Sequence, residues 1–181
     1  MKKLLFLCIG LLLMACSDDD AEITQTEVNL SINHFKTTSL LYGTALIGQE
    51  EGTLETFTIP RISGFDFQPG YTYSLIANRI TTKNAGTNAT TDSYDLIAVQ
   101  TQDTIPPNTE FRVPLAKFVN GVGYVTWIRG NAELGYVLNN EIPIHCSQFC
   151  TELMSRVVIE ENITGVFEHG PNGTYILKEL D

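Results

Sequence analysis

The stretch ISGFDFQPGYTYSL, residues 62–75, decides the fold class of this chain. Gly64 and Gly70 supply turn conformations that residues with side chains resist, and Pro69 presets the bend before Gly70. Four aromatic side chains fall on adjoining strand faces, where such rings pack well across strands: Phe65, Phe67, Tyr71 and Tyr73. The stretch therefore predicts a strand–turn–strand corner that forms core, with an aromatic platform for a ligand as the alternative.

Apolar and polar residues alternate on both sides of this corner, a period of two that indicates half-buried strands. Clusters of Gly, Asn and Pro separate the runs, as turns require. The predicted strands are residues 28–32, 71–75, 94–100, 111–113, 123–128, 134–138, 156–160, 166–168 and 174–180. Residues 169–173, HGPNG, predict a hairpin turn, and residues 148–154 predict a short helix. We expect an all-β fold, with small sandwich or barrel-like β domains and one short helix.

The first 15 residues have the pattern of a cleaved signal peptide. Lys2 and Lys3 precede an apolar run over residues 4–15, which is too short for a membrane span of about 20 residues. A buried core helix is the alternative, but it does not explain the basic start. The tetrapeptide that ends in Cys16 resembles the bacterial lipobox, whose cysteine is acylated and becomes the first mature residue. The sequence therefore predicts a lipid anchor at Cys16 and a membrane partner through that anchor.

An acidic run, Ser17-Asp18-Asp19-Asp20, follows the predicted lipid site. Its simple interpretation is a hydrated, self-repelling spacer, so that residues 16–27 form a tether. The run is also similar to the surface-export signal of Bacteroidota lipoproteins. This resemblance implies a cell-envelope protein, lipid-anchored in the outer membrane and exposed at the cell surface.

The charge balance excludes one class of partner. Signal cleavage removes two of the 11 basic residues and leaves nine against 21 acidic ones, a mature net charge near −12. Nucleic-acid binding depends on basic patches, so we expect no nucleic-acid partner.

The mature chain divides near two consecutive prolines, Pro106 and Pro107, which stop strands and stiffen linkers. We predict a β domain over residues 28–103, a linker over 104–110 and a C-terminal β region over 111–181. The polar residues 81–91 are expected to form a mobile loop between two strands.

The stretch 62–75 is similar to the I-x-G-F-x-Y-x-x-G-Y-x-Y-x-L signature of domain-of-unknown-function family 4377, which occurs in bacterial lipoproteins. Residues 94–99 look like that family's following strand, so the resemblance covers roughly residues 40–103. Phe67 stands where the family often has tyrosine. The family often carries a cysteine upstream of the signature, and none lies between Cys16 and Cys146 here. The resemblance implies fold and location, and no activity.

Cys146 and Cys150 are four residues apart, one helical turn, and outside the cytoplasm their expected state is a disulfide. The closed loop is small, so the bridge should stabilise by less than the roughly 3 kcal/mol of a 15-residue loop. Two alternatives remain open. A copper site would use His145, Cys146, Cys150 and Met154, and a redox-active dithiol would use the cysteines alone. A zinc site would need further ligands from His34 or His169.

Other candidates for chemistry have simpler interpretations. The sequence contains no G-x-S-x-G, H-E-x-x-H, P-loop or G-x-G-x-x-G motif. The acidic pairs at 50–51 and 160–161 are expected on a solvated face rather than in a glycosidase. Trp127 is expected in the core, with stacking on a sugar as the alternative. Asp103-Thr104-Ile105 resembles the O-glycosylation motif of exported Bacteroidota proteins, so Thr104 is a candidate glycosylation site.

We therefore expect a lipid-anchored envelope protein with a structural or binding role, no enzymatic activity and no cofactor. Metal or thiol-redox handling through the Cys146–Cys150 segment is one alternative, and a glycan-binding accessory role is the other.

Overall fold

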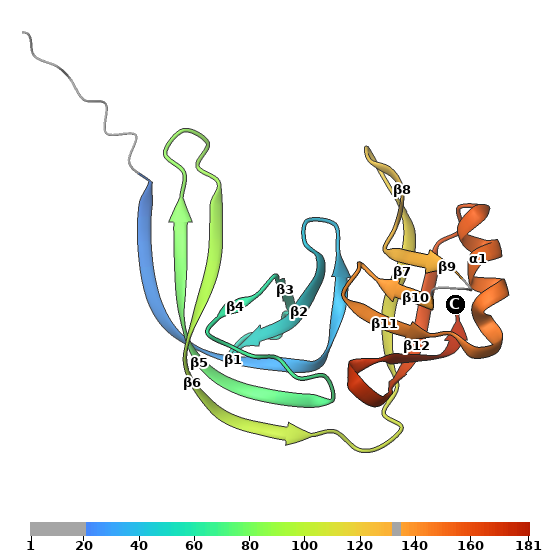
Figure 1. The fold of residues 1–181 in the computed structure, drawn as a ribbon. Coiled ribbons are helices and arrows are strands. Elements are labelled where there is room, and N and C mark those ends of the chain that lie inside the picture. The colour runs from blue at the N-terminus through green and yellow to red at the C-terminus, as the bar shows by residue number, and fades with distance from the viewer. Residues whose placement is uncertain (1–20, 132–134) are drawn as a thin grey trace, which may run out of the picture.

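The computed structural model describes residues 21–131 and 135–181. Two β-sheets and one short α-helix make up this part of the chain, which confirms the all-β prediction (Figure 1). The predicted signal peptide, the lipid site Cys16 and the acidic run 17–20 lie outside the described residues.

The first sheet is curled into a half-barrel. Its strands, in spatial order, are β3 (Phe57–Ile59), β2 (Gly43–Glu50), β1 (Glu22–Ser39), β5 (Tyr71–Lys83), β6 (Thr90–Thr104) and β4 (Ile62–Ser63). All neighbours are antiparallel except β4 and β6, which pair in parallel. Figure 1 shows the three long strands bending together around the short ones. Leu30, Ile32, Leu46, Leu75 and Tyr73 are among the residues of its buried core.

The corner at residues 62–75 closes this half-barrel, as the sequence predicts. Gly64 and Gly70 have φ angles of 76° and 88°, which favour glycine. The ring of Tyr73 lies 4.9 Å from that of Phe65 and 6.0 Å from that of Phe67. Both phenylalanines lie in the β4–β5 connection rather than on strands, because β4 ends at Ser63 and pairs with β6. The core-forming interpretation of the corner is confirmed.

The second sheet has seven strands. Its order is β8 (Gly123–Thr126), β7 (Phe111–Val119), β12 (Ile163–His169), β13 (Tyr175–Leu180), β11 (Ile142–His145), β10 (Gly135–Leu138) and β9 (Ile128–Asn131). The 3₁₀ turn Ser147–Phe149 (η1) leads into helix α1 (Cys150–Val158), which packs Leu153 fully into the sheet's core. The 3₁₀ turn Pro171–Gly173 (η2) joins β12 to β13, which confirms the predicted hairpin.

Strand β1 joins the two cores. Leu30 and Ile32 face the half-barrel, but an irregularity between Ile32 and Lys36 shifts the register with β2. Within this irregularity, Phe35 packs into the second core, where its ring stacks on Phe111 at 4.6 Å. Phe35 is three positions from Ile32, so strand alternation places it on the opposite face of β1, and the bulge bends the strand at this point. The two predicted halves therefore share this strand, although their sheets change at residues 105–110, where the linker is predicted.

Hydrogen bonds between the sheets fix this junction. The hydroxyl of Tyr175 accepts from the Lys36 amide at 2.8 Å and donates to the Lys36 carbonyl at 3.2 Å. The indole nitrogen of Trp127 donates to the Ser39 carbonyl at 3.1 Å, and Lys36 forms an ion pair with Glu141. Trp127 is 5% exposed, so its prediction as a core residue is confirmed.

Three local predictions need correction. Residues 156–158 are the end of α1 and not a strand, because Leu153 and Val157, one turn apart, both face the core. The polar loop is shorter than residues 81–91, since β5 reaches Lys83 and β6 begins at Thr90. The predicted strand 123–128 is two strands, separated at Trp127. No helix in the described residues has the length and apolar character needed to span a bilayer.

We predict that Tyr175→Phe lowers the free energy of unfolding by about 1–3 kcal/mol, because the partly buried Lys36 amide and carbonyl lose their hydrogen-bond partner. Tyr124→Phe is the matched control, since that hydroxyl donates to the Glu161 carbonyl at an exposed site. It should change the free energy by less than about 0.5 kcal/mol. Denaturant unfolding of both variants measures the difference, and equal losses would contradict the role assigned to the junction.

Two histidines lie at the same junction. His34 Nδ1 and His169 Nε2 are 2.9 Å apart, and Phe111 contacts both rings. Nδ1 of His169 is buried and has no hydrogen-bond partner among the described residues. Burial lowers the pKa of both histidines, and the neighbouring His34 helps to bring the pKa of His169 to about 4. The folded protein therefore holds this pair neutral.

We predict that stability falls as the pH decreases from about 6.5 towards 4. The unfolded chain binds protons in this window that the folded chain does not, so the free energy of unfolding declines with the pH. His169→Gln should weaken this dependence. His145→Gln, at an exposed site, should leave it unchanged. Thermal unfolding across the window compares the three proteins, and identical slopes would show that the pair does not contribute.

Candidate binding groove

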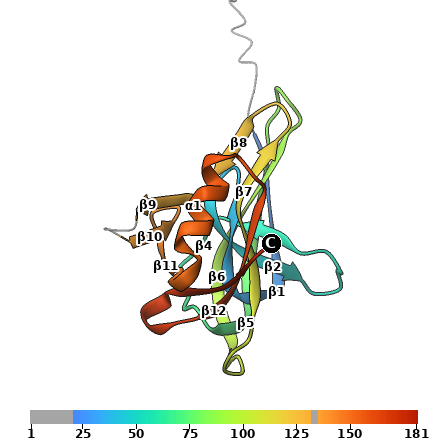
Figure 2. The ribbon, with the colours of Figure 1, turned by 90° about the vertical axis from the view of Figure 1, so that its right-hand side faces the viewer.

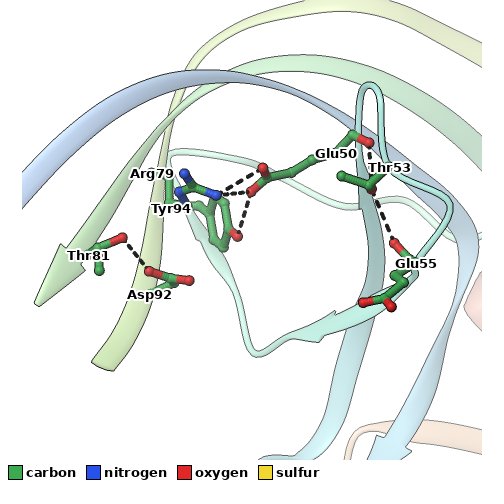
Figure 3. Close-up of polar contacts among 7 residues, drawn as sticks. All are labelled: Glu50, Thr53, Glu55, Arg79, Thr81, Asp92 and Tyr94. Carbon is green, nitrogen blue, oxygen red and sulfur yellow. Dashed lines mark hydrogen bonds and ion pairs between the residues drawn. The ribbon is translucent and has the colours of Figure 1, made fainter. Parts of the chain in front are cut away.

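A groove of about 670 Å³ opens at one end of the half-barrel core. One wall is the β2–β3 connection, residues 51–56, and the other is the inner face of β5 and β6. Figure 3 shows the polar side chains that line it. Roughly 300–1,000 Å³ is the usual size of a small-ligand site, and mouths of β-barrels are a common place for one.

Arg79, Tyr94 and Asp92 line the β5–β6 wall and belong to two neighbouring cross-strand pairs. Arg79 lies opposite Tyr94, and Thr81 lies opposite Asp92. Side chains two positions apart share one face of a strand, so these pairs continue the face on which Ala77 is buried. Thr81 donates a hydrogen bond to Asp92 through its hydroxyl. The wall therefore passes from apolar core to charged mouth along a single face.

Glu50, the last residue of β2, crosses the groove to this wall. Nη1 of Arg79 lies 2.9 Å from both carboxylate oxygens of Glu50, and the Tyr94 hydroxyl donates to Oε1 at 3.3 Å (Figure 3). The side chains of Arg79 and Glu50 are 32% and 18% exposed. Burial raises the pKa of Tyr94 well above its usual value, and the negative charge of Glu50 adds to the effect. Tyr94 consequently keeps its proton and remains a donor to Glu50.

The β2–β3 connection is held in a defined shape. The Thr53 hydroxyl donates to the Glu50 carbonyl at 2.8 Å, and the Gln49 amide donates to the Thr53 carbonyl at 2.8 Å. This turn places Leu54 at the rim, where it is 97% exposed. Glu55 follows it, also exposed. The rim thus offers an apolar side chain and a carboxylate on a braced loop.

The lining suits recognition rather than acid–base chemistry. Three carboxylates and one guanidinium border the groove, and the guanidinium is already paired with Glu50. Glu55 and Asp92 lie on opposite walls beside the apolar Leu54 and Phe57. Carboxylates accept hydrogen bonds from ammonium, guanidinium or hydroxyl groups. The arrangement therefore favours a ligand that has such donors next to an apolar face.

The predicted bridge residues come together. Cys146 and Cys150 lie at disulfide distance, with their Cα atoms 5.0 Å apart. Cys146 is 3% exposed and belongs to the second core, and Cys150 packs against that core. The bridge spans the entry into α1 beside the core of the second sheet, and neither cysteine lines the groove.

The four candidate copper ligands do not converge. His145 is exposed on the face of β11 opposite to buried Ile144, and Cys146 is buried next to it. Met154 packs against the core from α1. In the described residues, no group of three or more His, Cys, Asp or Glu side chains is placed to hold a metal ion. His34 and His169, the candidate zinc ligands, contact each other at the sheet junction instead.

The remaining candidates have separate positions. Thr104 is exposed at the end of β6, opposite Tyr71. Glu51 accepts a hydrogen bond from Asn29, and Glu161 pairs with Arg156. The expectation of a solvated face does not hold for Glu50, which is the anchor of the groove. One sequence signal could have indicated a buried carboxylate partner. It is Arg79, which follows Tyr73, Leu75 and Ala77 on the buried face of β5.

Comparison with known proteins gives no relative: no family model, no curated protein and no solved structure matches this chain. The resemblance to domain-of-unknown-function family 4377 therefore stays a prediction.

We predict that Arg79→Gln lowers the free energy of unfolding by about 1–3 kcal/mol, because it leaves the half-buried Glu50 carboxylate without its charged partner. Glu50→Gln should lower the free energy of unfolding by less in the Arg79→Gln background than in the wild-type protein. A double-mutant cycle then yields a coupling energy of about 0.5–3 kcal/mol.

Arg112→Gln is the control for this cycle, because its ion pair with Asp181 is largely exposed. It should change the free energy of unfolding by less than about 1 kcal/mol. A coupling energy of zero between Arg79 and Glu50 would show that their contact does not organise the groove.

Proposed function

We propose that the protein is a lipid-anchored cell-envelope protein with a binding role, and that the Glu50–Arg79–Tyr94 groove is its contact site. The observation that carries the proposal is the groove itself, a ligand-sized hollow with a half-buried ion pair at its base and a braced, exposed rim. Buried polar groups that are already hydrogen-bonded give a site fixed geometry before a ligand arrives.

The anchor is supported by the sequence. A basic start, an apolar run and a lipobox-like tetrapeptide precede Cys16, and an acidic run follows it. Several acyl chains on one cysteine give firm attachment, since each buried CH₂ contributes about 0.8 kcal/mol. We place the protein in the outer membrane and at the cell surface, on the resemblance of residues 17–20 to an export signal.

Binding accounts for the groove better than catalysis does. The carboxylate nearest the core, Glu50, already accepts hydrogen bonds from Arg79 and Tyr94, so its oxygens are engaged within the protein. Metal or thiol-redox handling has less support, because His145, Cys146 and Met154 do not face a common space. Glycan binding remains a second candidate, since Asp92 and Glu55 beside Phe57 present hydrogen-bond acceptors and an aromatic side chain to sugar hydroxyls.

Two ligand collections test the proposal: a glycan array, and an array of short peptides that contain lysine or arginine. We expect wild-type protein to retain members of one array, and Asp92→Asn and Leu54→Ser to lose them. Ile97→Ser is the control, because Ile97 is exposed on the outer face of β6, away from the groove. Retention that is unaffected by the groove variants would place the contact site elsewhere, and retention by neither array would remove both ligand classes.

The anchor is tested separately. Intact mass of protein extracted from membranes should show acyl chains on Cys16, and Cys16→Ser should release the protein into the soluble fraction. An unmodified Cys16 in membrane-extracted protein would contradict the anchor and leave the groove untouched.

A further inference from the structure

We propose that one end of the molecule rests on the lipid surface to which Cys16 is anchored, and that exposed apolar side chains there enter the headgroup region. We call this surface the apolar end and define it by Phe118, Val122, Val158 and Ile159. The inference rests on the anchor in the proposed function and goes beyond it, because an anchor alone leaves the folded part free to turn.

The apolar end is formed by two elements. Phe118 and Val122 flank the β7–β8 turn and are 60% and 69% exposed, and Val158 and Ile159 end α1 at 76% and 65% exposed. Large apolar side chains so exposed and so close together mark an interaction surface more often than a solvated one.

Hydrogen bonds hold the two elements together. The Phe118 amide donates to Oδ1 of Asn162 at 2.7 Å, and the Tyr124 hydroxyl donates to the Glu161 carbonyl at 3.0 Å. Asn162 and Glu161 lie in the connection between α1 and β12. The four apolar side chains are therefore presented from a braced pair of turns rather than from two independent loops.

The chain enters the fold at this same end. Strand β1 begins at Glu22, and Figure 2 shows its start, the β7–β8 turn and the upper end of α1 towards the top of the molecule, whereas Figure 1 shows the start of β1 on the opposite side from the other two. Six residue steps lead from Cys16 to Glu22. At roughly 3.3–3.6 Å a step, they reach at most about 22 Å. A lipid on Cys16 therefore holds the start of β1 within that distance of the bilayer, at the end of the molecule that also carries the apolar side chains.

The charges near this end select the kind of lipid surface. Glu160 and Glu161 lie beside the apolar side chains, and the aspartates 18–20 precede the fold. Glu161 is neutralised by Arg156 at 2.7 Å, but the remaining carboxylates repel anionic headgroups. A zwitterionic phospholipid surface avoids this repulsion and still accepts apolar side chains at its boundary.

Tryptophan quenching tests the proposal. Lipidated mature protein carrying Phe118→Trp or Val122→Trp is reconstituted in phosphatidylcholine vesicles whose acyl chains are brominated near the headgroup. The control is Leu54→Trp, at the exposed rim of the groove. Wild-type protein, whose Trp127 is buried, supplies the background. We expect the tryptophans at 118 and 122 to lose most of their added fluorescence, and the tryptophan at 54 to keep it.

Flotation of the vesicles and intact mass of the bound protein separate the two proposals. One result would overturn the apolar-end inference alone: the protein is lipidated and floats, but the tryptophans at 118 and 122 are quenched no more than the tryptophan at 54. The apolar end would then be available to a protein partner. Protein without acyl chains overturns the anchor, and the inference falls with it. Unfolding transitions of the three variants that match wild type show that the substitutions leave the fold intact.

Discussion

The use of both faces of β1 is the constraint on which the rest of the structure depends. Leu30 and Ile32 face the half-barrel, whereas Phe35, an odd number of positions further on, faces the second core. The irregularity between Ile32 and Lys36 bends the strand there, where the Tyr175 hydroxyl binds both polar groups of the Lys36 backbone. Each sheet consequently buries side chains of the same strand.

Much of the fold could be predicted because its signals are local. The glycines of residues 62–75 need left-handed backbone, and the HGPNG turn joins two alternating runs, so both features are visible in the sequence. The error at residues 156–160 has a local cause as well. A run of Arg, Val, Val, Ile and Glu reads as a strand, but Leu153 and Val157 supply a helical repeat that burial against the sheet favours. At these residues, tertiary packing outweighed the strand propensity of the sequence.

The groove could not be predicted in the same way, because its parts are distant in sequence. Glu50 meets Arg79 and Tyr94 only once β2 and the β5–β6 ribbon curl towards each other. An acidic pair at 50–51 looks like an ordinary solvated face, since nothing near it in sequence shows that one carboxylate turns inward. The junction histidines were beyond sequence reasoning for the same reason, as 135 residues separate them. By contrast, Cys146 and Cys150 are neighbours in sequence, and their closeness follows from spacing alone.

The proposed site and the proposed lipid contact are compatible because the groove lies in the half-barrel and the apolar end in the second sheet, and the two face different directions. Figure 2 shows the β2–β3 connection projecting sideways from the molecule, at right angles to the line from the start of β1 to the opposite end. With the apolar end against lipid, the rim at Leu54 faces along the membrane rather than into it. A ligand that approaches beside the membrane reaches the groove without displacing the anchor. The short reach from Cys16 then limits tumbling, so the lipid would orient the groove as well as retain the protein.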